Sequence, residues 1–368
     1  MMLATTMDNK KKNICLILTL DYELWGDGSG NVFKQIIEPT TKILNICDEN
    51  RIKTTIFFEA IEYLKLKEEW EKGNSMGYDK NPITAIEDQL QKAALNGHDI
   101  QLHIHPQWVN AKYVNDIWEV DFSNWRLGDF NIDSDYSIED LLLDGKKTLE
   151  NIIDPVIPGY KCIALRAGGY NIMPSKDIFS AMQNLGLKVD SSVYPGGFAN
   201  GNLSRHNYRS VPTCLDFWWA NPEDITQLSE DKKEIIEIPI FALMQPRWKK
   251  ILDFQKIKSI LGKHPSAISS GTKENISKKT LSEKIKFLLE KEAFTWDFCL
   301  FNTSLHKKYL SYIETNLLNT RNLFVLIGHP KSLKNEKTFE SFIKLIQKRN
   351  YPYSFKTLTN IYTESGNL

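Results

Sequence analysis

The chain has 368 residues, with 46 basic and 46 acidic side chains and a formal net charge of zero. The basic residues are interspersed with acidic ones, which argues against a nucleic-acid partner or an anionic membrane surface. The length exceeds that of most single domains, but α/β barrels often reach about 250 residues as one unit. We therefore expect a disordered tail at 1–12 and one barrel domain with large insertions over 13–368.

The N-terminal residues contain no apolar core of signal-peptide length, and no later stretch approaches about 18 consecutive apolar residues. We therefore expect a cytoplasmic protein that does not span a membrane. The five cysteines are scattered and include no Cys-x-x-Cys pair, so neither a disulfide framework nor a thiolate zinc site is indicated. Nothing in the sequence sets the oligomeric state.

Apolar, β-branched runs alternate along the chain with patterns of helical period. The predicted strands are 14–20, 54–58, 99–104, 162–166, 187–192, 235–240 and 323–328. The predicted helices are 38–50, 82–96, 137–152, 174–185, 279–292, 304–318 and 335–349, the third with Ser137 and Asp140 placed as a capping box. This alternation predicts an α/β fold of parallel strands joined by crossovers.

Three segments interrupt the alternation, at about 106–135, 194–233 and 246–290. Long irregular segments in a compact α/β unit are usually functional or mobile. The first two follow strands with polar ends, so we expect them to overhang the carboxyl ends of the strands, where sites form in such sheets. The third is lysine-rich and is expected to be a helical insertion on the rim.

Two short patterns carry most of the chemical information: Asp21-Tyr22-Glu23 and His103-Ile104-His105. Each follows an apolar run, and residues two apart on a strand share a face about 6–7 Å apart. Two imidazoles and a carboxylate make a three-ligand metal set with an open position for water. The alternatives are that the acidic residues are loop caps and the histidines are hydrogen-bonded core residues. His98 begins the same strand on the opposite face, so we expect it to bond backbone rather than metal.

Three further polar residues stand at predicted strand ends: Arg166, Asp190 and His329. Any one of them could be structural. If all these strand ends open on one barrel mouth, however, the cluster holds more charge than loop capping requires.

The order of these motifs resembles the polysaccharide deacetylase family, the NodB-homology or carbohydrate esterase family 4 group. The segments that carry the resemblance are LTLDYE, GHDIQLHIHPQW, LRAGGY, VDSSVY and LIGH, spread over roughly residues 13–360. The resemblance implies a distorted, roughly seven-stranded (β/α) barrel. It also implies that Asp21 is the catalytic base oriented by Arg166, and that His329 is the general acid tuned by Asp190.

The resemblance implies metal ligation by His103, while relatives with an Asp-x-Asp opening favour Glu23 over Asp21 as the carboxylate ligand. The family's second histidine would fall at Gln107, so His105 is assigned from strand geometry instead. The expected cofactor is a divalent metal, with Zn²⁺ first and Co, Ni, Mn and Fe left open.

These expectations predict a metal-dependent hydrolase that removes an acetyl group from an N-acetylated sugar or a glycan precursor. Trp108, Tyr170 and Tyr194 are expected to contact the carbohydrate, because flat aromatic faces offer large apolar area. Two other functions stay open. One is a glycoside hydrolase on a related barrel, which would use the carboxylate pair. The other is a non-catalytic glycan-binding module that has lost its metal.

Overall fold

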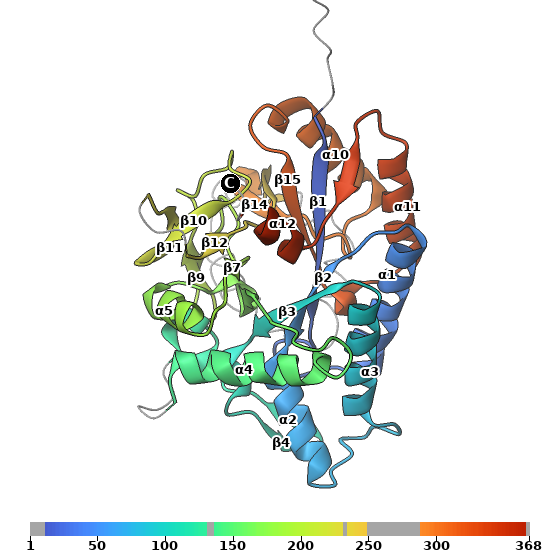
Figure 1. Ribbon diagram of the computed structural model, residues 1–368, viewed down its shortest axis with the longest axis vertical. Coiled ribbons are helices and arrows are strands. Elements are labelled where there is room, and N and C mark those ends of the chain that lie inside the picture. Colours follow the sequence, from blue (N-terminus) through green and yellow to red (C-terminus); the bar gives the residue numbers. More distant parts are fainter. Residues whose placement is uncertain (1–11, 131–135, 231–233, 249–287, 366–368) are drawn as a thin grey trace, which may run out of the picture.

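The computed structural model describes residues 12–130, 136–230, 234–248 and 288–365. Nearly all of the expected tail at 1–12, and most of the expected insertion at 246–290, lie outside these described residues. The described chain is a mixed α/β structure in which a curled, mostly parallel sheet is surrounded by helices (Figure 1). This agrees with the predicted α/β class and is consistent with a distorted barrel.

The main sheet has the strand order β11-β10-β12-β7-β6-β3-β2-β1-β15, and β16 also pairs with β1. From β15 to β12 every neighbouring pair is parallel, whereas β10 and β11 are antiparallel. A parallel bridge between Ile240 and Val325 joins the chain after β12 to β15, which brings the two ends of the parallel part together. The bounds are β1 (Ile14–Tyr22), β2 (Thr55–Glu59), β3 (Asp99–Ile104), β6 (Ala164–Ala167), β7 (Val189–Asp190), β10 (Trp218–Asn221), β11 (Asp224–Leu228), β12 (Ile236–Glu237), β15 (Leu323–Gly328) and β16 (Tyr353–Phe355).

Most of the helices lie on the outside of this sheet, whereas α12 packs against its inner face. The helices are α1 (Glu38–Glu49), α2 (Ala60–Glu71), α3 (Pro82–Leu95), α4 (Ile138–Ile153), α5 (Lys176–Asn184), α10 (Thr303–Tyr312), α11 (Glu336–Gln347) and α12 (Leu358–Ser365). The capping box of Ser137 and Asp140 begins α4 as expected. Helix α2 was not predicted, because its first turn is buried on all sides, and this blurs the one-sided apolar pattern typical of a helix.

Side-chain alternation along the strands divides the core into two clusters. In β1, Leu16 and Leu18 face the helices, whereas Cys15 and Ile17 belong to a smaller cluster formed by the other face of the strands. Helix α12 contributes Leu358 and Ile361 to that inner cluster. Because successive side chains alternate, the odd-numbered residues that follow in β1 continue along the inner face toward the carboxyl end of the sheet.

The insertions form short hairpins and single turns beside the sheet. The hairpins are β4 (Lys112–Val114) with β5 (Ile117–Glu119), β8 (Phe198–Asn200) with β9 (Arg205–Asn207), and β13 (Ala242–Pro246) with β14 (Lys291–Thr295). The predicted helix 279–292 is mostly outside the described residues, and its last two residues are strand rather than helix, since they begin β14. Within the described ranges, no helix is long and apolar enough to cross a membrane.

Candidate active site

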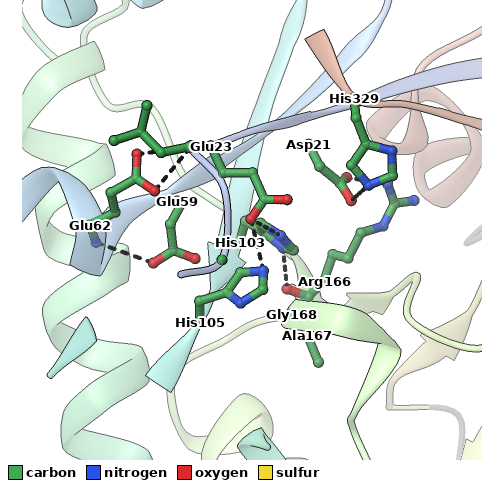
Figure 2. A network of polar contacts seen from close by, with 12 residues as sticks. Asp21, Glu23, Glu59, Glu62, His103, His105, Arg166, Ala167, Gly168 and His329 are labelled. Carbon is green, nitrogen blue, oxygen red and sulfur yellow. Dashed lines mark hydrogen bonds and ion pairs between the residues drawn. The ribbon is translucent and has the colours of Figure 1, made fainter. Parts of the chain in front are cut away.

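The carboxyl ends of β1 and β3 bring Glu23, His103 and His105 together on the inner face of the sheet (Figure 2). Glu23 Oε2 lies 2.8 Å from His105 Nε2 and 3.4 Å from His103 Nε2. The two imidazole rings are 4.9 Å apart and nearly perpendicular. All three side chains are buried, so their donor atoms converge in a site from which most water is excluded.

The hydrogen bonds of His103 leave one of its ring nitrogens available. His103 Nδ1 donates to the backbone carbonyl of Arg166 at 2.8 Å, so the ring proton is on Nδ1 and Nε2 carries a lone pair. Among the described residues His103 Nε2 has no hydrogen-bond partner, although the side chain is only 1 % exposed. A buried, unpaired imidazole nitrogen beside a carboxylate and a second imidazole is what a divalent metal would satisfy. The donor set therefore fits the metal implied by the sequence.

The charge states of the cluster also suit a cation. Burial works to raise the pKa of Glu23, but the Lys331 ammonium and the interaction with His105 outweigh it and hold that pKa well below its usual range. Burial lowers the pKa of His105 against the opposing effect of Glu23. Glu23 is therefore an anion and His105 a neutral ring, which are the forms that bind metals.

Asp21 stands beside this set and is held by Arg166 from β6. Arg166 Nη1 donates to Asp21 Oδ1 at 2.7 Å and to Thr19 Oγ1 at 2.8 Å. Arg166 Nε donates to the carbonyl of Ser191, and the guanidinium lies over the Phe57 ring. Burial works to raise the pKa of Asp21, but Arg166 reverses the effect and the pKa is lowered. Asp21 is thus a fixed carboxylate.

His329 follows β15 and faces Asp21 across a short gap, with His329 Nε2 3.6 Å from Asp21 Oδ2. Its other nitrogen, Nδ1, is bonded to Asp297 Oδ2 at 2.8 Å. Burial lowers the pKa of His329, but the hydrogen bond and charge of Asp297 and the charge of Asp21 raise it overall. His329 can therefore carry the proton that a general acid needs.

The expected partnership between Asp190 and His329 is not found. Asp190 is fully buried and accepts hydrogen bonds from the backbone N–H and the hydroxyl of Ser192, with Glu237 as its carboxyl neighbour. Asp297 takes the position beside His329 because it follows β14 and bridges to Ile327 of β15. The sequence offered only a TWDF segment beyond the lysine-rich insertion as a signal for it.

Lys331 is a second residue that the sequence did not reveal. Its ammonium donates to Glu23 Oε1 at 2.8 Å and to the carbonyl of Leu24 at 2.6 Å, and its side chain is 7 % exposed. Two residues after His329, in LIGHPKSL, it stands close enough to a site residue in sequence to have been a candidate. Because Lys331 engages Oε1, the opposite oxygen of Glu23 is presented to the histidines.

A second group of possible ligands, Asp21, Glu23 and His329, also converges. This group is the weaker cation site, because Arg166 already neutralises Asp21 and Asp297 holds His329. Asp21 and His329 suit proton transfer better than metal ligation.

The three expected carbohydrate contacts divide into two kinds. Trp108 is 1 % exposed and packs edge-on against Trp118, so its ring face is not available to a sugar and that expectation is wrong. Tyr170 and Tyr194 are partly buried and pack against each other with ring centroids 5.0 Å apart. Burial and the charges of Asp21 and Asp297 raise the pKa of Tyr170, so Tyr170 lies near these two carboxylates. His98 bonds Asp48 and the backbone N–H of Thr54, as expected of a residue outside the site.

Comparison with known proteins finds similar solved structures only. No family model and no curated protein matches the chain. Two similar structures are provisionally assigned as polysaccharide deacetylases. The first, from Mycobacterium smegmatis, shares 13% identity over 98% of this chain and 93% of that one, with a TM-score of 0.49. The second, from Pseudomonas aeruginosa PAO1, shares 10% identity over 95% and 89%, with a TM-score of 0.46.

Puue allantoinase is also similar, at 11% identity over 95% of this chain and 88% of that one, with a TM-score of 0.47. Polysaccharide deacetylases thus recur among the similar structures, and theirs is the family that the motif order resembles. At these identities and TM-scores the similarity carries no conclusion about chemistry, which has to come from the side chains of the site.

Proposed function

We propose that the chain is a metal-dependent hydrolase that removes an acetyl group from an N-acetylated sugar or glycan precursor. The observation that carries this proposal is the buried, unpaired Nε2 of His103, which points at Glu23 and His105 beside a separate carboxylate and imidazole. Glu23, His103 and His105 would hold the divalent metal, and the bound metal would activate water and polarise the acetyl carbonyl. Zn²⁺ is the expected ion.

The chain's own residues would carry the proton transfers. Asp21, ionised and fixed by Arg166, would take a proton from the attacking water. The hydrogen bond and the charge of Asp297 favour the protonated form of His329. His329 would then donate a proton from Nε2 to the departing amine. Asp21 Oδ2 and His329 Nε2 lie 3.6 Å apart, so base and acid would act next to each other on the same substrate group. The products would be acetate and a free amino sugar.

The glycoside hydrolase alternative fits the same residues less well. That chemistry needs one carboxyl group that is protonated and a second carboxylate across the scissile bond. Asp21 and Glu23 both have lowered pKa values, so neither is the acid. They also follow each other on one strand end, within 4.8 Å of a common partner, instead of flanking a substrate.

The test is an assay of purified, Zn²⁺-loaded protein on N-acetylglucosamine oligosaccharides and nucleotide sugars. The proposal predicts acetate release that a chelator abolishes, with every glycosidic bond intact. New reducing ends without acetate would favour the glycosidase. Neither product across a broad panel would favour the binding module.

A further inference from the structure

Gln107 is a buried polar residue whose hydrogen bonds are incomplete. It lies in the short 3-10 helix η2 (Pro106–Trp108) that follows β3, with no exposed surface. Its Nε2 lies 2.8 Å from His105 Nδ1 and 3.3 Å from the carbonyl of Gly26. Its Oε1 has no hydrogen-bond partner within the part of the chain that the structure describes. A buried orphan oxygen next to a candidate metal ligand requires an explanation.

The orientation of this amide fixes the proton of His105. When Gln107 donates its N–H to Nδ1, the single ring proton of His105 must be on Nε2, where it donates to Glu23 Oε2 at 2.8 Å. In that tautomer His105 Nε2 carries the proton and cannot bind a metal. When the amide is turned by half a rotation, Gln107 Oε1 faces His105 Nδ1 and accepts its proton, and His105 Nε2 carries a free lone pair. The turn gives up the contact of Gln107 Nε2 with the Gly26 carbonyl, so it is expected only when a bound metal offsets that loss.

His103 does not face this choice. The partner of its Nδ1 is the carbonyl of Arg166, which can only accept, so His103 keeps its proton on Nδ1 in either state. Only His105 has a partner that can both donate and accept. A glutamine at this position can therefore serve two states of the site, whereas a carboxylate could serve only the metal-binding one.

The ring of His105 is also held in place, so the proton moves while the ring does not. A Cβ at Gly168 would lie 2.5 Å from His105 Nδ1, which shows how closely the backbone packs against the ring. Trp125 packs edge-on against the same ring, with centroids 6.0 Å apart. The ring cannot swing aside to change its partners, so the amide of Gln107 has to turn.

We propose that Gln107 is a positioning residue whose side-chain amide reverses when a divalent metal binds, switching His105 from a donor to Glu23 into a metal ligand. The inference rests on the metal site of the proposed function. The imidazole keeps one proton throughout, so its charge does not change. Without metal, Gln107 donates to His105 and His105 donates to Glu23. With metal, His105 donates to Gln107 and its Nε2 faces the ion.

The test is nitrogen NMR of protein labelled with ¹⁵N-histidine, in which long-range proton–nitrogen correlations identify the tautomer of each ring. Signals are assigned by the loss of one set in His103→Ala and His105→Ala. In metal-free protein His105 should be the Nε2–H tautomer and His103 the Nδ1–H tautomer. On adding Zn²⁺, His105 should change to Nδ1–H while His103 keeps its proton on Nδ1. His105 showing the same tautomer in both states would overturn the proposal.

Two variants extend the test to affinity for Zn²⁺. Gln107→Glu offers only acceptors, so His105 should be Nδ1–H even without metal, and Zn²⁺ should bind about 10-fold or more tightly than in the wild type. Gln107→Met offers neither role and should weaken Zn²⁺ binding by about 10–100-fold. Unchanged affinity in both variants would also overturn the proposal. If Zn²⁺ does not bind the wild type at all, both the proposed function and the role of Gln107 are refuted. Tight binding without a tautomer change refutes Gln107's role alone.

Discussion

Asp297 Oδ2 and His329 Nδ1 are joined by a 2.8 Å hydrogen bond between two segments that run side by side at the carboxyl end of the sheet. The bond fixes the orientation of the imidazole, and the negative charge of Asp297 stabilises the protonated ring. His329 Nε2 is left facing Asp21. The pair therefore determines the pH range over which His329 could act as an acid.

Replacing Asp297 by Asn should shift the pH dependence of activity. The raised pKa of His329 depends on the hydrogen bond and charge of Asp297, so Asp297→Asn lowers that pKa. The acid is lost as pH rises through the pKa, so the alkaline limb of kcat/KM should move to lower pH. Asp190→Asn is the matched control and should leave this limb in place, since Asp190 bonds Ser192 instead. An alkaline limb that moves in Asp190→Asn but not in Asp297→Asn would reverse the assignment.

Arg166→Met should destabilise the protein and alter Asp21. It leaves the Asp21 carboxylate buried without its main cation, at a cost of about 3–5 kcal/mol in the free energy of unfolding. The folded-state pKa of Asp21 is lowered, so its contribution is present above the unfolded pKa and is lost as pH falls through the folded one. Denaturant unfolding at several pH values should show the variant losing less stability on acidification than wild type. Parallel losses in the two proteins would contradict the ion pair's contribution.

Lys331→Met should make stability depend more strongly on metal. Without the ammonium, Glu23 loses its main charge partner, and the metal-free protein should unfold at a lower temperature. A divalent ion can replace the missing positive charge, so Zn²⁺ should raise Tm by more in Lys331→Met than in wild type. Lys337→Met, on the exposed side of α11, is the control. Equal Zn²⁺ shifts in Lys331→Met and wild type would show that Lys331 does not act through Glu23.

Gly168→Ala should disturb the site through His105. The added methyl group would lie 2.5–2.6 Å from three atoms of the imidazole ring, so the ring or the backbone has to shift. Overpacking of this kind costs about 1–3 kcal/mol, and the displaced ring should bind metal more weakly. Gly201→Ala, whose nearest heavy atom would be 3.8 Å away, should change neither stability nor Zn²⁺ affinity. Wild-type Zn²⁺ affinity in Gly168→Ala would argue against His105 as a ligand.

The sequence predicted the strands, and the face on which the polar residues at each strand end lie, because both depend on local patterns. Alternation along β1 and just beyond its end puts Asp21 and Glu23 on the face that also holds Ile17, and the same period puts His103 and His105 together at the end of β3. These placements follow from the two-residue repeat of a strand. They need no knowledge of the connections between strands.

The rest of the site depends on contacts between distant segments, which periodicity does not encode. Asp190 ends the short strand β7 and Asp297 follows the short strand β14, and only the pairing of Asp297 with Ile327 places it beside His329. Trp108 looked like a surface ring because it follows the histidines in a polar segment, yet Trp118 of the β4–β5 hairpin covers it. The direction in which Lys331 points likewise depends on distant partners, because its ammonium donates to Glu23 and to the carbonyl of Leu24 just after β1.

The most direct test of the account is the metal content of purified protein measured by elemental analysis after Zn²⁺ loading and desalting. We expect one Zn²⁺ per wild-type chain. His103→Ala and Glu23→Gln should lose the ion while remaining folded by circular dichroism, because they remove ligands at the end of the sheet. Asp21→Asn should keep one Zn²⁺ and lose acetate release. Full Zn²⁺ content in His103→Ala, or its loss only in Asp21→Asn, would contradict the site formed by Glu23, His103 and His105.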